Sequence, residues 1–418
     1  MKRKIILAAL LALAGGVATS WRWAAEWLYL AGIGAAATLT FSAGDSTSVP
    51  VTLPRNLILI PARVDDRQVN LILDSGLQFT VLNADRAAEL RLPLHGERQV
   101  PGGGPGHRLT VAFARSATIA IGDARFRPRR LAAIPLSFLE PFIGERIDGI
   151  IGHDLLAQAR VRIDYARRTV TLSRGSSAPL STGGTALPVR IEGREAIVDV
   201  TLFPLSGDSV VAALKVDTGS PTALGVDGGL VRSTRLAGSN QARREVPGIG
   251  LAGESRGEAF LLRGVRVGDA VFETPLVYST PTDSTTTGGV IGAELLRQFT
   301  LTFDYANARL WLQPAAGGSR SLDYDRSGLL LVAAGRAFDS LVVRHVESRS
   351  PAAQAGVLPG DVIVRVDSIG AEALRLTGVI SALMHGGVTT TLGVVRAGRS
   401  MALTIRLPEH YPSHPGPP

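Results

Sequence analysis

The sequence predicts a mainly β fold with two similar lobes, followed by a smaller domain. The 47 glycines and 24 prolines among 418 residues favour many short strands and turns over long helices. When residues 148–172 are laid on residues 288–312 without a gap, 10 of 25 positions are identical, which indicates an internal duplication of one β-rich unit. The region from Ser327 to Leu407 has no counterpart in the repeat, and we expect it to fold separately.

The N-terminus has the layout of a secretory signal. Three basic residues precede an apolar run from Ile5 to Ala14, and small residues follow it. A second uncharged apolar stretch, Trp27 to Phe41, is shorter than the roughly 20 residues that a membrane-spanning helix needs. We expect residues 1–45 to be a signal peptide, or an N-terminal membrane anchor, plus a linker. The protein is therefore expected to be exported, either periplasmic or anchored and facing the periplasm or the extracellular side.

Composition argues against several classes of function. The net charge is +8, but the basic residues are spread thinly and form no block interleaved with aromatics, so we expect no nucleic-acid partner. The chain has no cysteine, which excludes disulfides, thiolate metal sites and a cysteine nucleophile. Its 7 histidines are scattered without paired-ligand spacing, so we expect neither a metal nor another cofactor.

The first half is expected over residues 46–174, with a polar linker at its start from Ser46 to Pro54. A buried strand is then followed by Asp74-Ser75-Gly76, so an aspartate stands at the strand end and a glycine lets the chain turn. Val81 to Leu90 has helical spacing, with Asn83 as a plausible N-cap.

The second half, expected over residues 185–315, repeats this plan. Asp217-Thr218-Gly219 follows another apolar strand, 143 residues after the first triplet. One such triplet is an ordinary turn sequence. Two of them, each at the head of a longer repeated pattern, indicate a two-part site.

Two adjacent carboxylates can hydrolyse a peptide bond if both contact one water. Like charges at that distance cannot both ionise, so the pair shares a proton. The ionised partner takes a proton from the water, and the protonated partner donates to the scissile carbonyl. The hydroxyl after each aspartate can cross-link the two loops, and each glycine lets backbone N–H groups approach the carboxylates.

These features resemble the aspartic proteases. Each half is similar to a retropepsin-like unit, in which an apolar-apolar-Gly segment (here Ile150-Ile151-Gly152 and Val290-Ile291-Gly292) threads beside the catalytic loop. The resemblance covers about Val51 to Leu312 and implies two β-barrel lobes in a bilobal fold that cleaves polypeptide substrates. It also implies roles for particular residues: catalytic Asp74 and Asp217, and dyad-supporting Ser75, Gly76, Thr218, Gly219 and Ser220.

The resemblance further implies flaps that close over the substrate, with Gly103, Gly104 and Gly250 as candidates. One departure from the family pattern is Leu77-Gln78, where a small residue usually follows the glycine. It keeps an alternative open, in which the protein is a non-catalytic, degenerate protease-like platform that acts as a peptide-binding module.

The third region resembles a small α+β PDZ domain, expected over residues 325–408. The run from Ser350 to Ile363 carries this match. The resemblance implies that a peptide C-terminus adds as a strand beside Leu329 to Val332, with its carboxylate on backbone N–H groups near Gly328, Leu329 and Leu330. A PDZ-shaped spacer that binds no peptide is the alternative. Residues 409–418 are expected to form a disordered, proline-rich tail.

Overall fold

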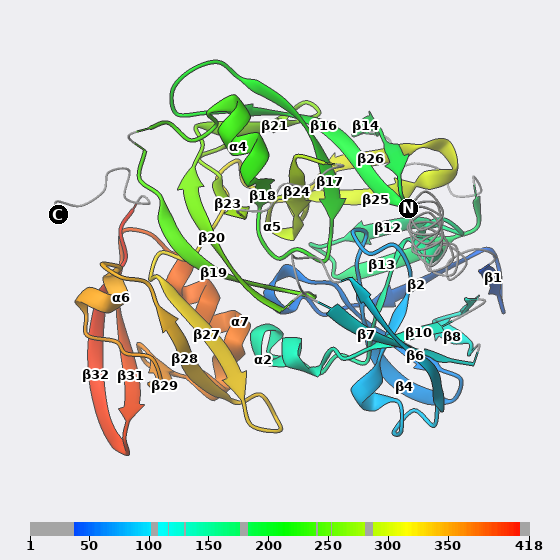
Figure 1. Cartoon of the computed structure of the whole chain (residues 1–418), viewed down its shortest axis with the longest axis horizontal. Coiled ribbons are helices and arrows are strands. Elements are labelled where there is room, and N and C mark those ends of the chain that lie inside the picture. Colours follow the sequence, from blue (N-terminus) through cyan, green and yellow to red (C-terminus); the bar gives the residue numbers. More distant parts are fainter. Residues whose placement is uncertain are drawn as a thin grey trace, which may run out of the picture.

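Figure 1 shows the computed structural model, which describes residues 37–101, 108–115, 117–128, 131–175, 183–239, 241–251, 253–280 and 287–409. Two β lobes lie side by side, and a smaller third domain packs against both. The predicted signal or anchor segment up to residue 36, the flap glycines Gly103 and Gly104, and the tail from residue 410 lie outside the described residues. Within the described ranges, the search for a helix long and apolar enough to cross a membrane finds none.

The first half forms one ten-stranded sheet with the order β1-β9-β8-β3-β4-β11-β5-β10-β7-β6. Its strands are β1 (Thr38–Phe41), β3 (Leu59–Val64), β4 (Arg67–Leu73), β5 (Val81–Asn83), β6 (Leu94–Pro101), β7 (Arg108–Ala114), β8 (Ile119–Ile121), β9 (Ala124–Arg127), β10 (Leu131–Ile134) and β11 (Gly149–Ile151). Its short helices are η1 (Pro54–Asn56), η2 (Ala84–Arg86), η3 (Ser137–Leu139), α2 (Glu140–Ile143) and α3 (His153–Leu156). Strand β11 lies between β4 and β5 and runs parallel to β4.

The second half repeats this sheet. Its strands are β15 (Arg190–Glu192), β16 (Glu195–Phe203), β17 (Val210–Asp217), β18 (Leu224–Asp227), β19 (Arg244–Gly250), β20 (Gly253–Leu261), β21 (Gly264–Val267), β22 (Ala270–Glu273), β23 (Leu276–Thr280) and β24 (Gly289–Gly292), with helices α4 (Gly228–Thr234) and α5 (Ala293–Leu296). The order β19-β20-β23-β18-β24-β17-β16-β21-β22 matches β6-β7-β10-β5-β11-β4-β3-β8-β9 strand for strand. The duplication predicted from the sequence is confirmed.

A six-stranded sheet joins the two halves. It contains β2 (Ser46–Pro50), β12 (Arg160–Asp164), β13 (Thr169–Ser173), β14 (Thr185–Pro188), β25 (Phe299–Asp304) and β26 (Arg309–Pro314), and η5 (Tyr305–Asn307) connects the last two. Strands β12 and β25 pair across the joint between the halves. There Arg160 Nη2 lies 2.8 Å from Asp304 Oδ2, and both side chains are buried, so the two charges compensate each other.

The third domain has its own sheet and its own core. It contains β27 (Leu329–Ala334), β28 (Ser340–Val346), β29 (Val362–Val366), β30 (Ile369–Gly370), β31 (Thr389–Arg396) and β32 (Arg399–Arg406), with helices α6 (Pro351–Gln354) and α7 (Ala371–Met384). Strand β27 is at the edge of this sheet. Buried Leu331, Val343, Ile363 and Val379 belong to a core separate from that of the two halves.

Three expectations from the sequence are wrong at the start of the first half. Thr38–Phe41, expected within the anchor or linker, forms β1 and pairs with β9. Ser46–Pro50, expected as a linker, pairs with β13 in the joining sheet. The segment from Val81 is a strand and a 3-10 turn instead of a helix, because β5 fills the place between β11 and β10. Asn83 nonetheless caps that turn, since its side chain accepts from the Asp85 N–H.

Candidate active site

Each candidate aspartate lies at the end of a central strand. Asp74 follows β4, and Asp217 is the last residue of β17. Strand β11 pairs in parallel with β4, and strand β24 pairs in parallel with β17. The Asp74 N–H donates to the Ile151 carbonyl over 2.9 Å. The predicted threading of the apolar-apolar-Gly segments beside both loops is confirmed, and it fixes the two strand ends at neighbouring positions.

The hydroxyls of Ser75 and Thr218 cross-link the loops reciprocally. Ser75 Oγ donates to the Val216 carbonyl over 2.8 Å and accepts from the Thr218 N–H over 3.1 Å. Thr218 Oγ1 donates to the Leu73 carbonyl over 2.8 Å and accepts from the Ser75 N–H over 3.0 Å. Both residues are fully buried, so every lost bond would leave an unpaired polar group in the core.

Gly76 and Gly219 let each loop pass against the carboxyl group of the other. Their N–H groups donate to the aspartate two residues earlier, to Asp74 Oδ1 over 2.7 Å and to Asp217 Oδ1 over 3.0 Å. A Cβ on Gly76 would lie 2.5 Å from Asp217 Cγ, and a Cβ on Gly219 would overlap the Asp74 carboxyl. The two carboxyl groups therefore face each other where the loops meet.

This proximity changes the protonation of the pair. Burial raises the pKa of Asp74, and the Asp217 charge and a hydrogen bond between the two carboxyls raise it further. The Gly76 N–H and the Lys215 ammonium act in the opposite direction and are outweighed. The pair consequently keeps a proton to higher pH than a solvated aspartate would, which suits one acid and one base at the same site.

Lys215 belongs to this site, although we assigned it no role from the sequence. Strand β17 alternates, so Lys215 and Asp217 point to the same face. Lys215 Nζ lies 3.4 Å from Asp217 Oδ2 and 3.7 Å from Glu195 Oε1, and it donates to the Gly76 carbonyl over 3.5 Å. These carboxylates raise the pKa of Lys215 although burial opposes them, so the ammonium stays charged. The available signal was that Lys215 is the only lysine after Lys4.

The residues after the two glycines differ, but both loops are held through backbone bonds. The Leu77 carbonyl accepts from the His153 N–H over 2.8 Å, and the Ser220 carbonyl accepts from the Ala293 N–H over 2.7 Å. The Ser220 hydroxyl lies 3.1 Å from Thr222 Oγ1. None of the four cross-linking bonds depends on residue 77, so the Leu77-Gln78 departure leaves that network intact.

A long hairpin made of β19 and β20, here called the flap hairpin, extends from the second half toward the first (Figure 1). Gly250 lies at its tip, where an added Cβ would meet no atom within 4 Å. Ile249 and Leu251 pack against the apolar cluster of the first half, on which Leu77 also packs. The hairpin thus reaches across to the loop of Asp74. In the first half, β6 and β7 pair as the corresponding hairpin.

Comparison with protein families agrees with this geometry. Residues 60–155 match the family described as aspartyl protease, and residues 342–396 match the PDZ domain. The chain contains an aspartyl protease domain and a PDZ domain. The matched protease region covers most of the first half, and the second half repeats its strand order to complete a bilobal, mainly β fold. A search of curated proteins found no match. These domains imply peptide or protein partners in general.

The PDZ turn predicted to bind a peptide carboxylate is already bonded within the chain. The N–H groups of Ser327 and Gly328 donate to Asp325 Oδ1 over 2.8 and 3.0 Å, and the Leu329 N–H donates to Ser327 Oγ over 3.2 Å. Leu330 follows in β27 and pairs with His345. Peptide-carboxylate binding at Gly328, Leu329 and Leu330 stays a prediction; in this structure Asp325 accepts from the Gly328 N–H and Ser327 accepts from the Leu329 N–H.

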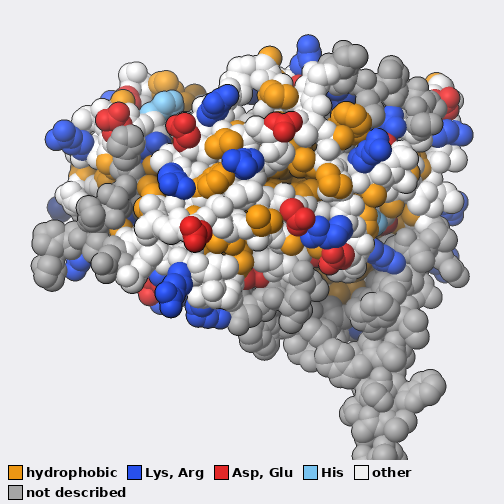
Figure 2. Space-filling model, turned by 90° about the horizontal axis from the view of Figure 1, so that it is seen from above, with side chains coloured by type: hydrophobic (Ala, Val, Ile, Leu, Met, Phe, Trp, Pro, Cys, Tyr) orange, Lys and Arg blue, Asp and Glu red, His pale blue; other side chains and the backbone are white. Residues whose placement is uncertain are grey.

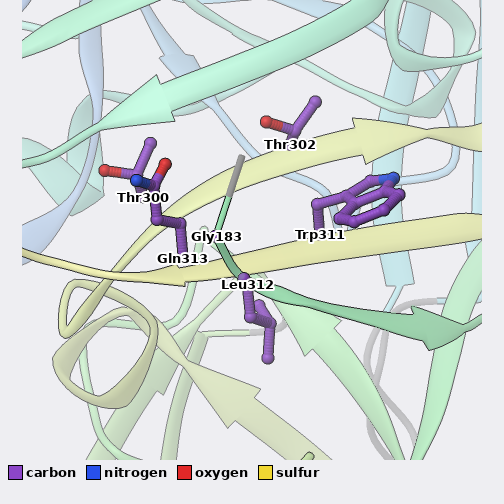
Figure 3. A pocket seen from close by; sticks show the side chains of 7 residues that line it. Gly183, Thr300, Thr302, Trp311, Leu312 and Gln313 are labelled. Atoms are coloured by element: carbon purple, nitrogen blue, oxygen red, sulfur yellow. The ribbon is translucent and has the colours of Figure 1, made fainter. Parts of the chain in front are cut away.

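The structure shows a small pocket away from this site. It lies on the joining sheet and is lined by Gly183, Gly184, Thr300, Thr302, Trp311, Leu312 and Gln313 (Figure 3). It has room for about one water molecule, and its lining has no titratable side chain. We assign it no chemistry.

Within the described residues, neither a charged patch on the face shown nor a cluster of metal ligands marks a second site. Seen from above, basic and acidic side chains are intermingled, so positive charge forms no single patch on that face (Figure 2). Among the described residues, no group of three or more His, Asp or Glu side chains is placed to hold a metal ion.

Proposed function

We propose that the protein is an aspartic endopeptidase that hydrolyses polypeptides through a water held by Asp74 and Asp217. The observation that carries this proposal is the reciprocal cross-link of the two loops by Ser75 and Thr218. It holds the two carboxyl groups against each other from opposite halves of one chain.

The chemistry follows from the shared proton. The ionised carboxyl takes a proton from the water while the water oxygen attacks the carbon of the peptide carbonyl. The protonated carboxyl donates its proton to the carbonyl oxygen. When the tetrahedral intermediate collapses, the carboxyl that gained the proton gives it to the leaving nitrogen, and a hydroxyl of the intermediate returns a proton to the other carboxyl. One water is consumed, the products are a carboxylic acid and an amine, and the pair of aspartates regains its single proton. The raised pKa of Asp74 favours this arrangement, because one proton remains on the pair while the other carboxyl is free to act as base.

We further propose that the enzyme is exported, on the strength of the basic and apolar residues at its N-terminus. Its substrates would then be polypeptides on the periplasmic or extracellular side, whether the N-terminus is removed or serves as an anchor.

The alternative of a non-catalytic peptide-binding platform is less well supported. Both halves retain the aspartate, the hydroxyl residue and the glycine with their bonds, and the N–H groups of the PDZ turn are taken by Asp325 and Ser327. A decayed protease with a working PDZ domain would be expected to show the reverse.

Cleavage of casein and of a peptide library across acidic to neutral pH tests the proposal. Asp217→Asn removes a proton-transfer group without changing shape, and the rate should fall by about 10²- to 10⁴-fold. Asp199→Asn is the matched control, because Asp199 is exposed on neighbouring strand β16 and should leave the rate unchanged. Pepstatin should inhibit the wild type. Absence of cleavage by pure wild type, or equal rates for both variants, would refute the assignment.

A further inference from the structure

The peptide groove of the PDZ domain holds a segment of the first half. In PDZ domains a peptide adds beside the edge strand, in the groove that a helix borders. Here α2 lies against edge strand β27 (Figure 1), and a Cβ on Gly144 would stand 3.0 Å from Leu376 Cβ in α7. Arg375 of α7 lies 3.8 Å from Glu145. Residues 140–145, here called the groove segment, therefore occupy the place of a bound peptide.

Arg55 fixes this arrangement. Its N–H donates to Thr377 Oγ1 of α7 over 3.2 Å, and its Nη1 donates to the Phe142 carbonyl of the groove segment over 3.0 Å. Its φ of 49° is unusual for a side chain of this size, and such a conformation persists where surrounding contacts hold it. Arg55 also interacts electrostatically with Asp325 beside the PDZ turn. One residue thus joins the groove segment, the helix and the turn.

The turn itself disfavours an incoming carboxylate. Asp325 accepts hydrogen bonds from the N–H groups of the turn. Glu347 Oε2 is also close to the turn, since a Cβ added to Gly328 would lie 3.1 Å from it. Burial raises the pKa of Asp325 to about 6, while the bonds from Ser327 and Gly328 and the charge of Arg55 favour its ionised form. A peptide C-terminus would meet two carboxylates as well as a filled groove.

The same PDZ domain holds the flap hairpin at two points. Near the base of the hairpin, Arg244 Nη1 lies 2.9 Å from Glu347 Oε2, and both side chains are mostly buried. Near the tip, Glu254 Oε1 lies 3.0 Å from Arg344 Nη2, and both side chains are exposed. Because Ile249 and Leu251 pack on the apolar cluster beside the Asp74 loop, the hairpin spans from the PDZ domain to the first half.

We propose that the PDZ domain is an intramolecular latch, which docks through its own peptide groove onto the groove segment and keeps the flap hairpin closed. A polypeptide can reach the aspartates only when the hairpin lifts, and lifting it breaks the pairs of Glu254 and Arg244. Undocking the PDZ domain therefore opens the site. The effect of the latch on cleavage rests on the proposed protease function; its effect on hairpin motion does not.

Amide hydrogen exchange of residues 244–261 in the full chain tests the latch without any need for activity. Glu347→Arg sets two like charges against each other, so exchange in the hairpin should accelerate by about tenfold or more. The double variant Arg244→Glu with Glu347→Arg restores opposite charges and should return exchange toward the wild-type rate. Arg399→Glu, on the exposed far hairpin of the PDZ domain, is the matched control and should change nothing in the flap hairpin. Protection of β31 and β32 confirms that each variant is folded. Unchanged exchange in folded Glu347→Arg would overturn the proposal.

A chemical tether tests the consequence for cleavage. The chain has no cysteine, so Glu254→Cys with Arg344→Cys creates a single pair that a short bismaleimide can join. The joined protein should cleave polypeptides at least about tenfold more slowly than the same variant before joining. Each single-cysteine variant treated with the reagent is the control. Equal rates before and after joining would refute the latch. If the unjoined variant and wild type cleave nothing, the proposed function fails, and hydrogen exchange still decides on the latch.

Discussion

In the second half, the strand that ends at Asp217 places Lys215 beside the carboxyl group, whereas the corresponding position of the first half holds Ile72, buried in an apolar cluster. The strand registers establish the correspondence, since Ile72 pairs with Ile150 as Lys215 pairs with Val290. The second half thus supplies a cation to the site. The first half supplies an apolar surface on which Leu77 and the flap hairpin pack.

The cross-link between the loops shows no such divergence. Ser75 and Thr218 make equivalent pairs of bonds, and Gly76 and Gly219 stand against opposite carboxyl groups. The comparison indicates that the parts which set the distance between the two aspartates must match in both halves. The flanking residues are free to differ, and their differences adjust charge on one side and flap packing on the other.

The largest effect is expected where the halves are equivalent. Gly76→Ala and Gly219→Ala each place a methyl group inside contact distance of the opposite carboxyl, which must then move. Displacing a reacting group by about 1 Å costs on the order of 100-fold in rate, and we expect losses of that size for both variants. Measured kcat values check this. Gly238→Ala, where a Cβ would come no nearer than 3.4 Å to another atom, is the control. A strong loss for one glycine and none for the other would break the equivalence.

The sequence predicts the loops and the domain order because their signals are local and occur twice. Asp, a hydroxyl residue and Gly after an apolar strand are readable in one half, and repetition removes the ambiguity of a single turn triplet. The strand at Val81 was predicted as a helix because local spacing carries no information about β10 and β11, between which the segment is inserted.

Contacts between distant parts of the chain could not be predicted. Lys215 reaches a carbonyl of the opposite half, 139 residues away, and Arg55 binds Thr377 at a separation of 322 residues. Nothing in the residues near Arg55 indicates that this part of the first half contacts the PDZ domain. Docking depends on surface shape and charge that exist only after both domains have folded.

A smaller effect is expected from removing the cation of the second half. Lys215 lowers the pKa of Asp74, since a nearby positive charge favours the ionised carboxylate. In Lys215→Met that pKa rises, so the shared proton is lost at higher pH. The alkaline limb of the profile of kcat/KM against pH should move to higher pH, by on the order of one pH unit. The facing groups Asp74, Asp217 and Glu195 are unchanged, so the direction is unambiguous.

Two variants isolate charge from shape in this experiment. Lys215→Arg keeps the positive charge and should keep the limb near its wild-type position. Ile72→Met makes the corresponding change in the first half without altering charge, and it should not shift the profile. A Lys215→Met profile that superimposes on the wild type would show that the asymmetry of charge has no catalytic consequence.

The smallest effect is expected at the residue that departs most from the family pattern. Leu77→Ser gives the first half the residue that the second half has at Ser220. The cross-link does not involve residue 77, and the Leu77 carbonyl keeps its bond from the His153 N–H, so kcat should change by no more than about threefold. Serine removes an apolar side chain from the cluster on which the flap hairpin packs, so packing of the hairpin should weaken. We therefore expect KM to change more than kcat. The reciprocal variant Ser220→Leu should be more damaging, because it removes the hydrogen bond between Ser220 Oγ and Thr222 Oγ1. Steady-state kinetics of both variants decide the matter. If Leu77→Ser instead raised kcat by about tenfold or more, leucine would be a handicap at this position, and the first half would be the decaying partner of the pair.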